Sequence, residues 1–461
     1  MCTVAPVVRR LLSVRAAPLI VLAIVSGLSL GARAAALGEP CQSPCHRAGQ
    51  HTLIFDEAYY VNAARVIAGI HPPPGAHYAD APPGTDPNAE HPQGVKLIMA
   101  ASIELLGDGP LAWRLGSLVF GTIAILGMYA LVRAAGGGRW SAVGAAALMA
   151  CDNLLLVHGR IGTLDIYTVA GMVWGVAFYL RGWRWAAALA LAVAAAFKLV
   201  APYAIAVLAL LELGRLITAW RRGEGPVQWR LRPALARFAT CTIAGVAVFI
   251  GLLWLLGEIA TPYADATATL ITGGPFAHLE QMISYAAQQV SPHGPQGIAS
   301  YPWQWLVDLK PIVYLQINPS LPGAGLYAIH PVSRFLGMVS PPIMLLALPA
   351  LALCAYRLLW PRRKVESAVV RLDAGELQLA ILAVAWFIGT WLPFEVLSVI
   401  DSRTSYLYYM VIVMPGIYVA VTYLISRAWR LRRRLASAAV GVWALSVVIA
   451  VVVMYPFTPL F

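Results

Sequence analysis

Two adjacent acids, Asp56 and Glu57, follow the first long apolar run of the sequence. Ionisable side chains inside a lipid bilayer are costly, so they need a partner or have a function. A free carboxylate can accept a proton as a general base, and arginine or lysine at a membrane boundary can bind a phosphate group. The chemistry of the two acids therefore depends on which cations lie beside them, and on which side of a membrane.

The composition is that of an integral membrane protein. Of the 461 residues, 60% are hydrophobic and 12% charged, whereas soluble domains carry about 25% charged residues. Apolar runs of about 20 residues predict an all-α polytopic membrane protein rather than a barrel, which would show short alternating segments. About eleven spans are expected by this criterion, at 17–32, 113–132, 140–157, 165–181, 185–199, 201–217, 238–258, 338–360, 377–398, 405–425 and 435–455.

The basic residues predict the orientation. The net charge is +12, but it lies in short segments between apolar runs, which is typical of cytoplasmic loops and argues against nucleic-acid binding. If 93–107 is an interfacial helix rather than a span, most of the 33 Lys and Arg share the side of the N-terminus; if it crossed, this bias would vanish. We therefore expect a plasma-membrane protein with a cytoplasmic N-terminus and extracytoplasmic loops at 33–112 and 259–337.

The apolar runs and the loops between them also predict the fate of the N-terminal segment and the number of domains. The stretch "ARAAA" after the first apolar run resembles a signal-peptide cleavage site, but the orientation and span count favour an uncleaved signal anchor. Neither outer loop is long enough to suggest an independent domain, so 1–461 is expected to form one membrane domain. No Walker motif or phosphate-binding glycine loop is present, which argues against a soluble nucleotide substrate.

With this orientation, the ionisable residues in and beside the spans fall at the outer face. Each one alone could be an interfacial residue or a structural ion pair, but together they predict an outward-facing polar pocket roofed by the two loops. We expect Asp152 to be a structural partner of a buried cation. The full set is Lys96, Arg114, Arg160, Lys198 and Arg403 with Asp56, Glu57, Asp152 and Asp165, with Glu90 and His91 beside the interfacial helix, and with Glu395 and Asp401 in the same outer turn as Arg403.

Two further features of the outer loops leave alternatives open. Cys41 and Cys45, in "CQSPC", can form a local disulfide outside the cytoplasm; with His46 and His51 nearby they can also bind zinc, although this spacing is weak evidence for a metal. The aromatic stretch "YPWQW" at 301–305 can anchor the loop at the membrane interface, or its Trp303 can stack on a sugar or a peptide.

The order of these motifs resembles that of protein O-mannosyltransferases, within the C-type glycosyltransferases that use lipid-phosphate sugars. The matching stretches are "FDEAYY" (55–60), "EHPQGVK" (90–96), "AWRLGSLVFGTIAILGMYAL" (112–131), "LMACDNLLLVHGRIGTLDIY" (148–167), "AAFKLVAPY" (195–203), "SYPWQW" (300–305) and "SRTSYLYYMVIVMPG" (402–416). Gln93 and Gly116 replace family prolines, and Tyr409 stands where many members have histidine, so no role is assigned to it. The β-trefoil insertion of eukaryotic members is absent from 259–337, as expected of a bacterial-type member.

The resemblance implies a C-type architecture, a polyprenyl-phosphate mannose donor and a Ser or Thr hydroxyl of an exported protein as acceptor. Asp56 is expected to act as general base in a single displacement with inversion, and Glu57 to orient Asp56 or the acceptor. Arg114, followed by Lys96 and Arg403, is the first candidate for binding the donor phosphate. Residues expected to line the pocket or contact substrate are Glu90, His91, Arg160, Asp165, Lys198 and Trp303.

No metal or other cofactor is expected, because the leaving group is a phosphate ester and basic residues are plentiful. The expected partners are the lipid-linked sugar, the protein acceptor and membrane lipids, without nucleic acid. One alternative is a related lipid-phosphate-sugar transferase that modifies a glycolipid or a cell-wall glycan. An alternative of another class is a transporter or flippase, which would place polar groups at the bilayer midplane and show an internal repeat.

Overall fold

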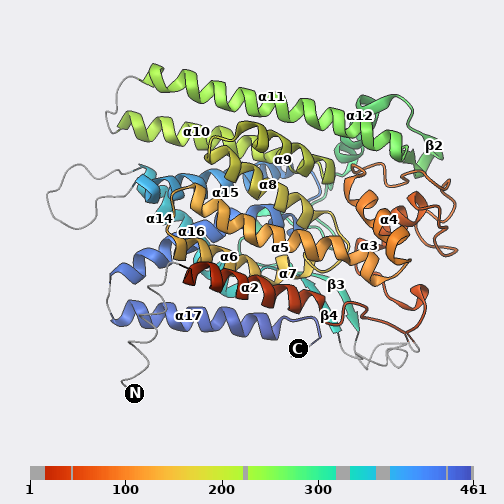
Figure 1. The fold of residues 1–461 in the computed structure, drawn as a ribbon, viewed down its shortest axis with the longest axis horizontal. Coiled ribbons are helices and arrows are strands. Elements are labelled where there is room, and N and C mark those ends of the chain that lie inside the picture. The colour runs from red at the N-terminus through yellow and green to blue at the C-terminus, as the bar shows by residue number, and fades with distance from the viewer. Residues whose placement is uncertain are drawn as a thin grey trace.

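A computed structural model describes residues 16–42, 45–221, 227–317, 333–359, 374–431 and 434–457. Long helices run side by side along the long axis of the molecule and form one bundle (Figure 1). The bundle helices are α2 (Ala17–Ala34), α5 (Pro110–Ala134), α6 (Arg139–Cys151), α7 (Asn153–His158), α8 (Asp165–Leu180), α9 (Arg184–Phe197), α10 (Tyr203–Arg221), α11 (Val227–Ile259), α14 (Pro341–Leu359), α15 (Ala374–Ile400), α16 (Met410–Arg430) and α17 (Arg434–Val453).

Every predicted span coincides with helices of this bundle, so the all-α membrane architecture is confirmed. Within the described ranges, 8 helices are long and apolar enough to cross a membrane. Two more, α8 and α9, are apolar but shorter, and the predicted span 140–157 is divided into α6 and α7. The number of spans therefore stays a prediction, whereas the multi-pass character is confirmed.

The division between α6 and α7 occurs at Asp152. Its backbone is extended, and its carboxylate accepts hydrogen bonds from the backbone N–H groups of Leu154 and Ser340, each at 3.1 Å, so it caps the N-terminus of α7. The hydroxyl of Tyr418 donates to the same carboxylate. The prediction that Asp152 pairs with a buried cation was therefore wrong: among the described residues, its partners are a phenol and two backbone amides.

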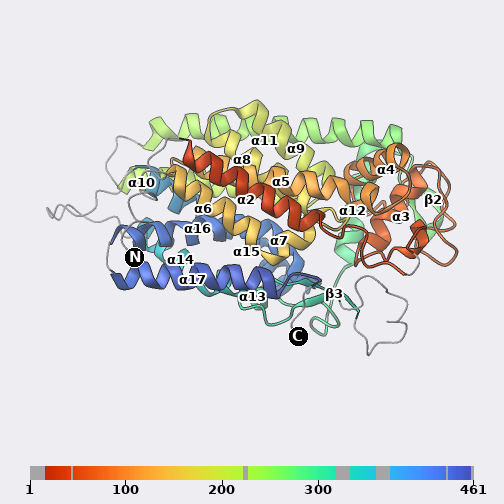
Figure 2. The same cartoon turned by 60° about the horizontal axis from the view of Figure 1, so that its bottom comes forward.

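Both predicted outer loops gather at one end of the bundle (Figures 1 and 2). Their elements are α3 (Glu57–Ile67), α4 (Gly94–Leu106), α12 (Gly274–Gln288), α13 (Pro302–Trp305) and the short antiparallel pairs β1 (Tyr263–Ala264) with β2 (Thr269–Leu270), and β3 (Ile312–Ile317) with β4 (Ser333–Gly337). The expected interfacial helix at 93–107 is α4, which packs on α3 and α5. The proline-rich segment between α3 and α4 contains no helix or strand element.

The two loops also touch each other. Asp86 and Asn88, in the segment between α3 and α4, form isolated bridges with Pro262 and Ala264, which follow α11. Backbone hydrogen bonds between Asp86 and its neighbours in the second loop measure 2.8–2.9 Å. Residues almost 180 positions apart are thus joined over the same end of the bundle.

A close approach at Gly116 shows how tightly the bundle packs below this end. A Cβ atom at Gly116, on α5, would lie 2.1 Å from the hydroxyl oxygen of Tyr167 on α8. A contact that short is sterically forbidden, so the position demands glycine while Tyr167 keeps this rotamer. The departure from the proline that the family carries here therefore matches a local packing requirement.

Candidate active site

A cavity of about 930 Å³ lies at the loop end, bounded by α3, α12, α15 and the chain before α16. That volume is in the range of small-molecule sites. The structure brings five predicted site residues together on its wall, although they are spread over almost 350 positions of the sequence. These residues are Asp56, Glu90, His91, Lys198 and Arg403.

Of the adjacent acids Asp56 and Glu57, Asp56 is the one that lines the cavity. It is partly buried, and its carboxylate makes no hydrogen bond or ion pair within the described part of the chain. Burial raises the pKa of this carboxyl to about 7; the positive charge of Lys198 opposes the rise and the negative charge of Asp165 adds to it. A carboxylate with a pKa near neutrality is well matched to proton abstraction at physiological pH.

The backbone before Asp56 is held in an uncommon conformation. Phe55 has φ 54°, in the left-handed region that a bulky side chain rarely adopts. Its ring stacks on Tyr314 of β3 at a centroid distance of 4.1 Å, and the Tyr314 hydroxyl lies 2.8 Å from Nε2 of His158. Nδ1 of His158 in turn lies 3.6 Å from Asp165. These contacts hold the Phe55 side chain in place, and so they fix the backbone from which the Asp56 carboxylate extends.

Glu57, by contrast, is completely buried and points away from the cavity. Its two carboxylate oxygens accept hydrogen bonds from Arg114 Nε at 2.8 Å and Nη2 at 2.7 Å. The backbone N–H groups of Ile54 and Gly162 donate to the same oxygens at 2.8 and 2.7 Å. The two hydrogen bonds from Arg114 join the start of α3 to α5, and Glu57 does not line the cavity.

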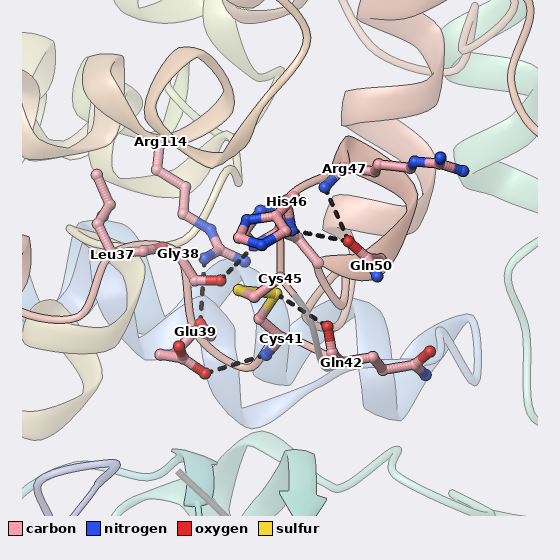
Figure 3. The surroundings of a disulfide bond; sticks show 11 residues. Leu37, Gly38, Glu39, Cys41, Gln42, Cys45, His46, Arg47, Gln50 and Arg114 are labelled. Atoms are coloured by element: carbon pink, nitrogen blue, oxygen red, sulfur yellow. Dashed lines mark hydrogen bonds between the residues drawn. A yellow bond between two sulfur atoms is a disulfide. The ribbon is translucent and has the colours of Figure 1, made fainter. Parts of the chain in front are cut away.

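Arg114 is enclosed together with Glu57. It is completely buried and does not line the cavity. Its remaining donors bind the main-chain oxygens of Leu37 and Glu39, beside the Cys41–Cys45 turn (Figure 3), and the oxygen of Thr52. A donor phosphate cannot reach a guanidinium group held in this way, so the expected phosphate role does not fit this placement.

Lys96 is likewise enclosed. Its ammonium group lies 2.6 Å from Asp86 Oδ2 and donates to the main-chain oxygens of Asn88 and His91 at 2.5 and 3.0 Å, with no exposed side-chain surface. It anchors the proline-rich segment on α4 and does not line the cavity. Its expected phosphate role therefore does not fit either.

Lys198 and Arg403 are the predicted cations that do line the cavity. Lys198, at the C-terminal end of α9, pairs with Asp165 at 2.7 Å and lies 5.1 and 5.4 Å from the ring centroids of Tyr408 and Tyr409. Arg403, in the turn before α16, donates to the main-chain oxygen of Ala286 on α12. Both are fixed by a protein partner yet leave charge directed at the same space as Asp56.

Glu90 and His91 form the wall supplied by the proline-rich segment. Glu90 accepts hydrogen bonds from Asn88 Nδ2 at 2.6 Å and from the Tyr78 hydroxyl at 3.4 Å, and burial raises the pKa of its carboxyl. Burial, reinforced by Lys198 and Lys96, lowers the pKa of His91 well below its ordinary value. His91 is therefore a neutral imidazole at pH 7.

Arg160 and Trp303 lie outside this cavity. Arg160 is completely buried, donates to the main-chain oxygens of Arg33 and Ala35 at 3.1 and 2.6 Å, and lies 4.7 Å from the ring centroid of Phe457. Trp303 is 48% exposed on the surface of α13. Neither placement supports the expected contact with substrate.

The tyrosines of "SYLYYM" were not predicted as site residues. Tyr406, Tyr408 and Tyr409 all line the cavity, and Tyr409 stacks on Phe394 of α15 at 4.7 Å. Their density just before an apolar run was a usable signal, because adjacent aromatic residues at a span end often line an interfacial site. Tyr409, to which no role was assigned, lies beside Lys198.

Among the described residues, the side chains grouped closely enough to hold a metal ion are Cys41, Cys45 and His51. The two sulfurs are joined in a disulfide (Figure 3), and Nδ1 of His51 is 2.6 Å from the Gly38 oxygen. A thiolate is the form of cysteine that binds metal. In this oxidised state the group is therefore a structural link of the first loop, and the disulfide alternative is the one the structure contains.

The sequence of this chain is similar to those of known mannosyltransferases. The family model for dolichyl-phosphate-mannose-protein mannosyltransferase matches residues 90–232. The polyprenol-phosphate-mannose–protein mannosyltransferase of Corynebacterium glutamicum is 24% identical over 315 residues, which cover 57% of this chain and 60% of that protein. The protein of the same name from Mycobacterium tuberculosis is 23% identical over 430 residues, 80% of this chain and 75% of that protein.

The fold is similar to that of a solved mannosyltransferase. The protein O-mannosyltransferase Pmt1-Pmt2 complex of S. cerevisiae, solved bound to the sugar donor, superposes with a TM-score of 0.71 at 11% identity, covering 96% of this chain and 90% of that one. The helical bundle of this chain therefore has the fold of that membrane protein. Together, the family model, the sequence relatives and the fold support a bacterial-type protein O-mannosyltransferase.

Proposed function

We propose that the protein transfers mannose from polyprenyl-phosphate mannose to Ser or Thr hydroxyls of exported proteins at the outer face of the plasma membrane. The observation that supports this most directly is Asp56, a carboxylate without an ion-pair partner in the described structure, on the wall of a 930 Å³ cavity that also receives Lys198 and Arg403. A base and two cations in one cavity suit an acceptor hydroxyl and a phosphate leaving group.

The reaction is a single displacement. Asp56 takes the proton of the acceptor hydroxyl while its oxygen forms a bond to the anomeric carbon of the sugar. The bond between that carbon and the phosphate oxygen breaks, and its electron pair leaves with polyprenyl phosphate, so the anomeric configuration inverts. Lys198 and Arg403 stabilise the negative charge that develops on the leaving phosphate, which is the kind of contribution that dominates such catalysis.

The other predicted residues support the site indirectly. The Glu57–Arg114 pair fixes the start of α3 and hence Asp56, and the Lys96–Asp86 pair fixes the segment that presents Glu90 and His91. No step in this scheme uses a metal ion.

The orientation rests on the charge distribution. The cavity lies at the end of the bundle that carries both long loops, whereas the C-terminal ends of α10 and α16 and the N-terminal ends of α11 and α17, which carry several arginines, lie at the opposite end (Figure 1). Cytoplasmic loops are enriched in Lys and Arg. We therefore place the cavity outside the cytoplasm, where exported acceptors and the donor of the outer leaflet meet.

The test is transfer of labelled mannose from polyprenyl-phosphate mannose to a Ser/Thr-rich peptide by the purified protein in proteoliposomes. Asp56→Asn should lose nearly all transfer, since removing a general base costs about 10²–10⁴-fold. Asp80→Asn is the matched control, because Asp80 is an exposed aspartate of the same loop outside this cavity. Equal transfer by Asp56→Asn and wild type would contradict the role of Asp56. Transfer to a glycolipid or glycan but to no peptide would contradict the proposed protein acceptor.

A further inference from the structure

A second cavity, of about 580 Å³, lies at the opposite end of the bundle. It is formed by the C-terminal ends of α8 and α10 and the N-terminal parts of α11 and α15. Figure 1 shows these ends on the left, far from α3, α4 and α12. No residue that we place in the catalytic cavity lines this second cavity, so it has no part in the reaction proposed above.

Its lining is strongly basic. Four arginines, Arg181, Arg215, Arg230 and Arg237, contribute to the wall, and the one carboxylate among the described lining residues is Glu212. Glu212 is buried and pairs with Arg215 and Arg237, each at 3.1 Å. Even with Arg230 left out of the count, one carboxylate among the described lining residues cannot neutralise the guanidinium groups of Arg181, Arg215 and Arg237, so the cavity lining keeps an excess of positive charge that favours an anion.

The donors are arranged around the same space. The Tyr179 hydroxyl donates to Glu212 at 2.8 Å, and Arg215 Nε donates to the side-chain oxygen of Gln378 at 3.0 Å. The buried amide nitrogen of Gln378 has no hydrogen-bond partner in the described structure. Arg181 lies over the ring of Trp183, 5.6 Å from its centroid, which holds its guanidinium at the rim. One guanidinium group can donate two parallel hydrogen bonds to two oxygens of the same phosphate. Phosphate is therefore an anion that suits this lining.

Exposed tryptophans indicate where this cavity lies in a bilayer. Trp183, Trp185, Trp220 and Trp229 are all exposed, and they flank the cavity at the α8–α9 connection and at the facing ends of α10 and α11. Exposed tryptophans at helix ends populate the headgroup level of membranes. The apolar part of the lining, Leu180, Leu216, Pro233, Leu377 and Ile381, continues along the same helices into the bundle.

We propose that this cavity binds the phosphate headgroup of an anionic membrane lipid in the leaflet opposite the catalytic site. The arginines supply the charge and the bidentate donors, and the apolar lining accommodates the glycerol and the first acyl carbons. Basic pockets between spanning helices on the cytoplasmic side are a recurrent form of lipid site. A free phosphate ion offers the same chemistry, so the experiment separates these two sources.

The test uses the purified full-length protein in detergent, analysed by native mass spectrometry and thermal unfolding with phosphatidylglycerol, phosphatidylcholine or inorganic phosphate. We expect retention of phosphatidylglycerol over phosphatidylcholine and a raised melting temperature. Arg181→Gln should weaken that retention by about fivefold, because one basic residue near an anionic lipid contributes about 1 kcal/mol. This variant leaves both ion pairs of Glu212 intact.

Arg184→Gln is the matched control. Arg184 lies over Trp185 at 5.7 Å, as Arg181 lies over Trp183, but it does not line the cavity. Retention of phosphatidylglycerol should therefore survive this change. Equal retention of the two lipids, or equal losses in Arg181→Gln and Arg184→Gln, would overturn the site. Stabilisation by inorganic phosphate at the concentration at which the lipid acts would overturn the lipid as its occupant.

Discussion

The pH dependence of transfer tests the assignment of Asp56 as general base. Burial raises the pKa of its carboxyl to about 7, and a general base acts only in its deprotonated form. Activity must therefore rise as the pH increases through this pKa and then level off. An ordinary aspartate, with a pKa of about 3.9, is deprotonated throughout the neutral range and would give a flat profile.

The size of the rise follows from the pKa. For a group with a pKa of about 7, roughly a tenth of the molecules hold the carboxylate at about pH 6 and roughly nine tenths at about pH 8. We therefore expect kcat/KM, which reports ionisations of the free enzyme, to increase about tenfold over that interval. The phosphodiester of the donor has no proton to lose in this range, so it does not contribute.

The assay is the initial rate of transfer in proteoliposomes at a series of pH values, with subsaturating donor. Two neighbours in the cavity must be separated from Asp56. The pKa of His91 is lowered well below its ordinary value, so this imidazole stays neutral throughout. The pKa of Glu90 is raised, so Glu90→Gln is the control and should keep the tenfold rise. A flat wild-type profile, or a rise that disappears in Glu90→Gln, would refute the reasoning.

Three further predictions follow from the same contacts. Glu57→Gln should lower the free energy of unfolding by about 3–5 kcal/mol, since it leaves the buried Arg114 without its charged partner; a double change of both residues to Met should be less destabilising, and a melting temperature equal to wild type would contradict the positioning role. Lys198→Met should reduce kcat and move the midpoint of the pH profile upward, because Lys198 lowers the pKa of Asp56; an unchanged midpoint would show that its charge does not reach the base. Transfer should continue in EDTA, and loss of activity that returns on adding a divalent cation would disprove the metal-free scheme.

Much of the fold was predictable from the sequence. Hydropathy alone located the bundle helices, because each must be apolar over most of its length to contact lipid or other helices. The distribution of Lys and Arg along the sequence predicted that the candidate site residues lie at one end of the bundle. The break between α6 and α7 was missed, because Asp152 lies within a continuous apolar run and only the folded structure shows that its carboxylate accepts the backbone N–H of Leu154 and so caps α7.

The site was predicted unevenly. Asp56, Lys198 and Arg403 reach the cavity as expected. Arg114 and Lys96 have the same residue types and the same position at a span or helix end, yet they are enclosed by main-chain oxygens of segments such as 37–39 and 88–91. Sequence patterns do not show which carbonyl groups a loop turns toward a cation, so they cannot separate a structural cation from one that faces substrate.

Local hydropathy, charge and motif order were enough to predict the membrane class, the helix positions, the common end of the two loops and the resemblance to protein O-mannosyltransferases. The tertiary structure decided the division of labour between Asp56 and Glu57. These adjacent side chains leave the start of α3 in different directions, one toward a cavity and one toward Arg114 on α5. That difference arises from backbone conformation at Phe55 and from packing against distant segments, which no local pattern encodes.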